Sequence, residues 1–184
     1  MLGKFCLCTV GVINQGNLKV EFNVFISYST HDLHQVKAVQ AQMQNTPLRV
    51  FVAEHSVTAS QQLAPSIDEA IQGCDLFIVL WSNSAKDSEW VSQEIGKATA
   101  LRKKILPLVL DEDLSLPGFI SDLKYIPVYK NVEGALQEAS RIAEDEYQKK
   151  LAAEQSLAAQ KQKEKDNLVI MGLGALFLWA ITQK

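Results

Sequence analysis

The chain has 184 residues, of which 47% are hydrophobic and 21% are charged, and its formal net charge is −3. These values are typical of one globular domain with an appendage, and they leave little room for a second full core. The charge balance gives no basic field, and no Lys/Arg cluster is interleaved with aromatic residues, so we expect no nucleic-acid partner.

The pattern of short and long apolar segments divides the chain into regions. Residues 1–21 contain a short apolar run and a turn signal at Asn14-Gln15-Gly16-Asn17, which indicates a possible extra β-hairpin. Residues 22–130 alternate short β-type runs with longer helical ones, as in a parallel sheet covered by helices on both faces. We therefore expect an α/β fold with a flavodoxin-like five-stranded parallel sheet.

The expected strands differ in how apolar they are, and this predicts their places in the sheet. DLFIVLWS is almost continuously apolar, which is typical of a central parallel strand. Pro107 and Pro127 indicate bulged or edge positions in the last two strands, and Asp32 is placed to cap the first helix. The five strands are expected, in chain order, at FNVFISYS, LRVFVAE, DLFIVLWS, ILPLVLDE and YIPVY.

After the last strand the composition changes. Residues 131–165 contain no proline and are rich in Ala, Glu, Gln and Lys, which predicts one long charged helix that acts as a spacer. The helix has only a weak apolar stripe, which favours a spacer over a strong zipper. That stripe consists of Leu136, Ala139, Ala143, Tyr147 and Leu151.

The tail, residues 166–183, is predicted to anchor the chain in a membrane. It contains 14 unbroken apolar or glycine residues, and 18 residues separate Lys165 from Lys184. If both lysines reach the interface, this length approaches that of a thin bilayer core. The lysines that precede the tail place the globular part in the cytoplasm, so we expect a single-pass C-terminal membrane anchor.

The carboxyl ends of the parallel strands form the rim where this fold binds ligands. Here that rim holds Ser27-Tyr28-Ser29, Ala53-Glu54 and Trp81-Ser82-Asn83. The chain has neither GxGxxG nor GxxxxGK[ST] for phosphates, and no GxSxG elbow of a serine hydrolase. None of the three histidines has a carboxylate or cysteine cluster that would complete a metal site, so we expect no metal.

SEWVSQEI, at residues 88–95, places Trp90 and Glu94 four residues apart on one helix face. An indole in this position can shield the carboxylate and pack against a substrate. The same spacing also fits an ordinary amphipathic helix, with Trp90 in the core and Glu94 as a solvated charge. Spacing alone therefore leaves both interpretations open.

Four blocks in this order together resemble the Toll/interleukin-1 receptor (TIR) domain, and the bacterial and archaeal type most closely, over about residues 22–130. The resemblance implies an enzyme that cleaves NAD⁺ at the nicotinamide glycosidic bond. The products would be nicotinamide and linear or cyclic ADP-ribose, and the enzyme would need no cofactor beyond its substrate. The blocks are VFISYSTHD, RVFVAE, DLFIVLWSNSA and SEWVSQEI.

The resemblance also implies roles for individual residues. Glu94 would be catalytic, and the expected substrate-binding residues are Trp90, Ser29, Thr30, Thr58 and Ser60. Some family members have arginine near Ser29, and many have glycine where Ser60 stands, so phosphate contacts and loop closure would differ here. Self-association through TIR–TIR contacts would activate the enzyme, in defence or cell-death signalling. The alternative is a non-catalytic scaffold that recruits other TIR proteins at a membrane.

Overall fold

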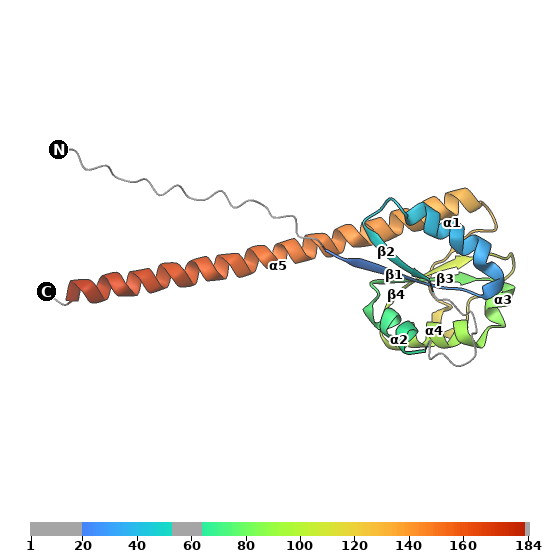
Figure 1. Ribbon diagram of the computed structural model, residues 1–184, viewed down its shortest axis with the longest axis horizontal. Coiled ribbons are helices and arrows are strands. Elements are labelled where there is room, and N and C mark those ends of the chain that lie inside the picture. Colours follow the sequence, from blue (N-terminus) through green and yellow to red (C-terminus); the bar gives the residue numbers. More distant parts are fainter. Residues whose placement is uncertain (1–19, 53–63, 183–184) are drawn as a thin grey trace.

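The computed structural model describes residues 20–52 and 64–182, and it describes side chains over residues 20–52 and 67–167. Apart from its last two residues, the segment 1–21, where the β-hairpin is expected, lies outside these ranges. The described residues form a sheet with helices on both faces and a long helix that extends away from it (Figure 1).

The five strands form one sheet in the order β2-β1-β3-β4-β5, and every neighbouring pair is parallel. This confirms the predicted flavodoxin-like order. The order reverses between β1 and β3, which is where such sheets bind ligands, outside the carboxyl ends of the strands. The strands are β1 (Phe22–Ser27), β2 (Leu48–Val52), β3 (Leu76–Trp81), β4 (Lys104–Val109) and β5 (Ile126–Pro127).

Alternating side chains of the strands build two separate apolar layers, one on each face of the sheet. On one face, the layer includes α1 (Leu33–Met43) and the first turns of α5 (Val132–Thr182). On the other face, it includes α2 (Ala64–Gly73) and α4 (Glu89–Ala100) (Figure 1). All six residues of β3 are buried between these layers, which explains their continuously apolar sequence.

The helical stretch predicted after β3 is divided in two. A short helix, α3 (Asn83–Lys86), is followed by α4, and a serine precedes each of them. The Oγ of Ser82 accepts a hydrogen bond from the amide of Ala85 at 2.9 Å, and the Oγ of Ser88 accepts one from the amide of Val91 at 3.4 Å. Because each serine satisfies an amide that has no partner within its helix, the chain starts a new helix at each.

The prediction that Asp32 caps the first helix is wrong. Asp32 makes no side-chain cap hydrogen bond; it ends a short 3-10 turn, η1 (Thr30–Asp32), that leads into α1. Its φ of −98° and ψ of 15° differ from the extended backbone of a usual N-cap residue. The carboxylate instead accepts a hydrogen bond from the Oγ of Ser82 at 2.6 Å, across the rim of the sheet.

The two proline predictions have different outcomes. Pro127 lies in β5, which is the two-residue edge strand of the sheet, as expected. Pro107 lies inside β4, which is not an edge strand because it lies between β3 and β5 in the sheet order. The pairing of β4 with β5 involves only Leu108 and Val109, so the missing amide of Pro107 interrupts no pairing on that side.

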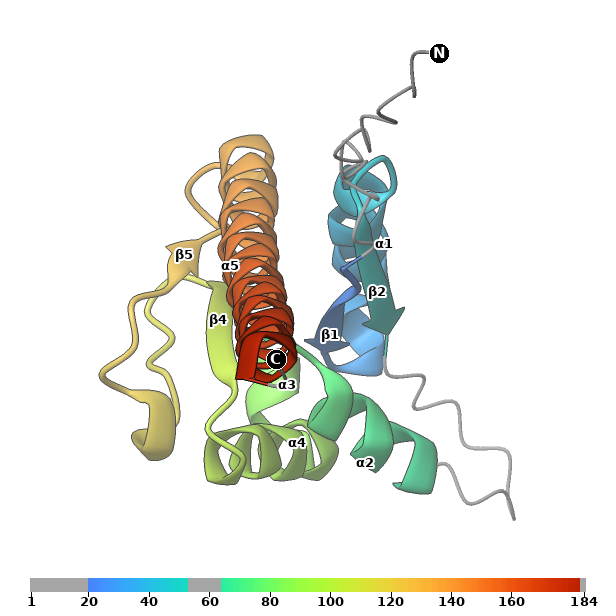
Figure 2. The same cartoon turned by 90° about the vertical axis from the view of Figure 1, so that its left-hand side faces the viewer.

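The helix predicted as a spacer begins within the core. Ala135, Ala139 and Ala143 are buried in the same layer as α1, because alanine lets the helix approach the sheet closely. Tyr147 meets the edge of the Phe22 ring, with the ring centroids 6.2 Å apart. Figure 2 shows α5 nearly end-on between α1 and β5. Only the later part of α5 leaves the domain, and residues 159–167 are all exposed.

The prediction of a single-pass membrane anchor over residues 166–183 is wrong. Within the part of the chain that the structure describes, no helix has a stretch that is both long and apolar enough to span a bilayer. The tail is the end of the same 51-residue helix that carries the charged segment. Its apolar run of 14 residues is shorter than the roughly 20 residues that a span requires. The orientation inferred from the flanking lysines therefore has no support either.

Candidate active site

Helix α4 positions the two residues on which the sequence interpretation depends. Its inner face carries Val91, Ile95 and Ala98, which are fully buried against the sheet and fix the rotation of the helix. Trp90 and Glu94 lie beside this face, one turn apart. The two residues differ in exposure: Trp90 is 55% exposed, whereas Glu94 is only 4% exposed.

The carboxylate of Glu94 is held by a serine at the end of β1. The Oγ of Ser27 donates a hydrogen bond to Oε2 of Glu94 at 2.5 Å, and Ser27 itself is fully buried. Burial raises the pKa of Glu94 to about 7, although the Ser27 hydrogen bond acts in the opposite direction. Glu94 therefore changes its protonation state near neutral pH, as catalytic carboxyl groups often do.

A hollow of about 450 Å³ lies at the rim, between the segment that follows β1 and the start of α4. Its lining includes three of the residues that are expected to bind the substrate, namely Ser29, Thr30 and Trp90. Of the described residues that line the hollow, none is Lys or Arg, and His31 and Asp87 are the titratable ones. The full lining is Ser29, Thr30, His31, Ser84, Asp87, Ser88 and Trp90.

The positions of the predicted residues relative to the hollow differ. Trp90 is too exposed to be a core residue, so its indole is open to a ligand. Glu94 is not among the described lining residues, and its carboxylate accepts the hydrogen bond from Ser27. Ser29 is buried, and its Oγ lies 3.3 Å from Nδ1 of His31. Thr58 and Ser60 lie outside the described residues, so their predicted roles stay predictions.

Two residues of the site escaped the sequence interpretation. The sequence places Ser27 at the rim without a role, and His31 is one of the three histidines for which no metal site is expected. A signal for Ser27 was present, since it has the same strand parity as Phe25 and therefore faces the layer that contains α4. Its contact with a residue 67 positions away has no local sequence signature.

Comparison with known proteins now identifies the domain. Residues 24–143, more than half of the chain, match the TIR domain family. The chain belongs to the TIR-domain family. A protein of Brachypodium distachyon named "Probable 2' cyclic ADP-D-ribose synthase" is 29% identical to it over 112 residues, which are 58% of this chain and 50% of that protein. This TIR-domain chain thus spans about half the length of that curated relative.

Two solved structures were found to be similar to this TIR domain. A prokaryotic SEFIR domain superimposes with a TM-score of 0.50 at 17% sequence identity, over 67% of this chain and 92% of that chain. The TIR domain of a Toll-related receptor from Hydra magnipapillata gives a TM-score of 0.47 at 19% identity, over 62% of this chain and 97% of that chain. At these identities, the SEFIR comparison concerns the fold alone.

Proposed function

We propose that this TIR domain cleaves NAD⁺ at the nicotinamide glycosidic bond, which gives nicotinamide and linear or cyclic ADP-ribose. The observation that carries the proposal is the buried carboxyl group of Glu94, which Ser27 holds at the rim and whose pKa is raised to about 7. The name of the Brachypodium relative, a cyclic ADP-D-ribose synthase, supports the same substrate class.

The chemistry requires a fixed negative charge beside the ribose. When the bond between C1′ and the nicotinamide nitrogen breaks, its electron pair stays on that nitrogen, and positive charge develops on the ribose. Ionised Glu94, held by Ser27, would stabilise that charge. Nicotinamide leaves as a neutral molecule, so its departure needs no general acid. Water, or a hydroxyl of the ADP-ribosyl cation itself, then attacks C1′ and releases a proton, which the carboxylate can accept.

The hollow beside α4 suits the remaining parts of the substrate. The exposed indole of Trp90 offers a flat surface for an aromatic ring, and the hydroxyls of Ser29 and Thr30 offer hydrogen bonds to ribose or phosphate oxygens. Since the described lining has no Lys or Arg, phosphate binding would depend on these hydroxyls, on His31 and on backbone amides. Glu94 lies one helical turn further along α4, so the ribose must enter more deeply than the ring that stacks on Trp90.

We further propose that self-association activates the enzyme. An exposed Trp90 at the edge of an open hollow leaves one side of the site available to a second copy of the domain. Thr58 and Ser60, in the loop that follows β2, are proposed to contribute to the site and to this contact. The rate of NAD⁺ cleavage per molecule should then rise with protein concentration.

Nicotinamide release from NAD⁺ tests the proposal. The full chain, free at high concentration and clustered on beads, is compared with Glu94→Ala and with Glu89→Gln, which removes an exposed charge from the same helix. The proposal predicts turnover by the parent and by Glu89→Gln, and none by Glu94→Ala. If a folded Glu94→Ala variant matches the parent, or if the clustered parent releases no nicotinamide, the enzymatic proposal is wrong and the non-catalytic scaffold remains.

A further inference from the structure

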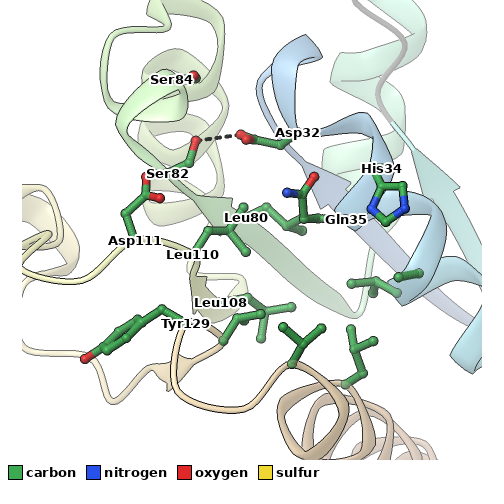
Figure 3. A pocket seen from close by; sticks show the side chains of 15 residues that line it. Asp32, His34, Gln35, Leu80, Ser82, Ser84, Leu108, Leu110, Asp111 and Tyr129 are labelled. Carbon is green, nitrogen blue, oxygen red and sulfur yellow. Dashed lines mark hydrogen bonds between the residues drawn. The ribbon is translucent and has the colours of Figure 1, made fainter.

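A second cavity, of about 280 Å³, lies on the face of the sheet opposite to Glu94, between α1 and the start of α5. Figure 3 shows its lining. One end is polar, with Asp32, Ser82 and Asp111. The rest is mainly aliphatic, with a surface formed by Ala38, Val39, Leu80, Leu108, Leu110, Val128, Val132 and Leu136. His34, Gln35, Ser84 and Tyr129 complete the lining.

The polar end brings two carboxylates together. Oδ2 of Asp32 accepts the hydrogen bond from Ser82, and Asp32 is only 7% exposed. Oδ2 of Asp111 accepts hydrogen bonds from the backbone amide and from Nδ2 of Asn83, at 2.7 and 2.9 Å. Figure 3 places the two carboxylates on either side of Ser82. Asp32 ends η1 and Asp111 lies just after β4, so the fold brings the two residues to the same end of the cavity.

These two negative groups form no ion pair in the part of the chain that the structure describes, although the charge of His31 acts on Asp32. Among the described residues, no Lys, Arg or His nitrogen forms an ion pair with Asp32 or Asp111 within 4.0 Å. Burial raises the pKa of Asp32, and the nearby charge of Asp111 raises it further, whereas the Ser82 hydrogen bond, the charge of His31 and a backbone hydrogen bond from Ser29 lower it. A cation between the two carboxylates would relieve both the repulsion and the cost of burial.

We propose that this cavity binds a small organic cation, an amine or guanidinium group carried on a short apolar body. The cationic group would donate hydrogen bonds to Asp32 and Asp111. The apolar body would pack against Leu80, Leu108 and Leu136. A volume of 280 Å³ is at the lower limit for ligand sites and suits a molecule of about ten non-hydrogen atoms.

The cavity is separate from the proposed NAD⁺ site but adjoins it. Thr30 lines the hollow beside Trp90, whereas Asp32, at the other end of the same turn η1, lines the cavity. Ser84 lines both. Because binding of a cation needs no cleavage of NAD⁺, this inference does not depend on the proposed function.

Binding of phenethylamine to the full chain tests the inference. The probe has nine non-hydrogen atoms, and 2-phenylethanol has the same shape without the charge. Isothermal titration or amide NMR shifts should give the amine a dissociation constant on the order of 0.1–1 mM, and the alcohol should bind at least about 10-fold more weakly. Equal affinities, or no binding of the amine, would overturn the proposal.

Variants place the binding site. Asp32→Asn and Asp111→Asn should each weaken amine binding about 10-fold, and asparagine can still accept the hydrogen bonds from Ser82 and Asn83. Ala38→Leu should reduce binding by filling the cavity while leaving both carboxylates in place. Asp122→Asn, an exposed charge elsewhere, should bind like the parent. If the three cavity variants all bind like the parent, the amine binds elsewhere and the proposal is wrong.

Discussion

Each face of the sheet has a hydrogen bond from a serine hydroxyl to a carboxyl group, but the surroundings of the two bonds differ. On the α2/α4 face, Ser27 at the end of β1 donates to Glu94, and on the α1/α5 face, Ser82 just after β3 donates to Asp32. Glu94 is enclosed by the core, whereas Asp32 lines a cavity and has a second carboxylate, Asp111, nearby. A serine hydroxyl thus orients a carboxyl group in either place, but burial and neighbouring charges decide its pKa.

The different surroundings of Glu94 and Asp32 suit the two carboxyl groups to different proposed roles. Under the proposed function, Glu94 would act as a single charge on a ribose, and burial raises the pKa of this carboxyl group to about 7. The pair of carboxylates around Ser82 is instead suited to hold a positive group in an open cavity. Substitutions at Glu94, Ser27 and Trp90 distinguish the proposed role of the buried carboxyl group from a purely structural one.

Replacing the carboxylate should have the largest effect. Glu94→Gln keeps the shape of the side chain and can accept the Ser27 hydrogen bond, but it removes the charge. We expect nicotinamide release to fall by at least about 100-fold, as when one stabilising group is removed from an active site. The rate at saturating NAD⁺ measures the effect. Glu89→Gln should keep the parental rate, and equal losses in both variants would show that the loss is not specific to Glu94.

The stability of the fold should depend on the protonation of Glu94. Its pKa is raised from 4.5 to about 7, so the folded state favours the protonated form. This contribution is fully present below about pH 4.5 and is lost as the pH rises through 7. We expect the free energy of unfolding to fall by about 2 kcal/mol more in the parent than in Glu94→Gln between pH 5 and pH 8. Urea unfolding at both pH values measures the difference, and parallel pH profiles would contradict the raised pKa.

Removing the serine should shift the pH dependence of catalysis. The Ser27 hydrogen bond lowers the pKa of Glu94, so Ser27→Ala should raise it further. Since the ionised form is the proposed active one, the rising limb of the pH–rate profile should move by about one unit to higher pH. The rate should therefore fall about 10-fold at pH 6 and much less at pH 9. A uniform loss at all pH values would mean that Ser27 acts only through the structure.

The smallest effect on stability is expected at Trp90. Because its indole is 55% exposed, Trp90→Ala should change the free energy of unfolding by less than about 0.5 kcal/mol. The KM for NAD⁺ should rise about 3- to 10-fold through loss of stacking. Trp81 provides the contrast, since it is buried and its Nε1 donates to the carbonyl of Ser115 at 3.0 Å. Trp81→Ala should cost about 3 kcal/mol or more in urea unfolding.

The arrangement of the sheet was predictable because its signals are local. The continuous apolar run of β3 and the alternation of strand and helix patterns indicate a parallel sheet without any long-range information. The resemblance to TIR domains, carried by four blocks, directed attention to Trp90 and Glu94. Ser29, Thr30 and Trp90 line one hollow, and their predicted role in substrate binding stays a prediction.

The remaining features depend on contacts between distant segments. Ser27 and Glu94 are 67 positions apart, and Asp32 and Ser82 are 50 positions apart, so neither hydrogen bond has a local signature. A cap position for Asp32 was the reasonable local expectation, but the hydroxyl of Ser82 and the turn η1 give its carboxylate another partner. The tail was misinterpreted because 14 apolar residues come close to the length of a span without reaching it.

Under the proposed function, the carboxyl group of Glu94 titrates near neutral pH and performs the chemistry. The most direct test is to follow the ¹³C shift of the Glu94 carboxyl carbon with pH, and to measure kcat/KM for NAD⁺ over the same range. We predict that both titrate with a pKa near 7 and that the carboxyl signal is absent in Glu94→Gln. Titration of Glu94 near 4.5, its ordinary value, or a rate that does not follow its ionisation, would contradict the account.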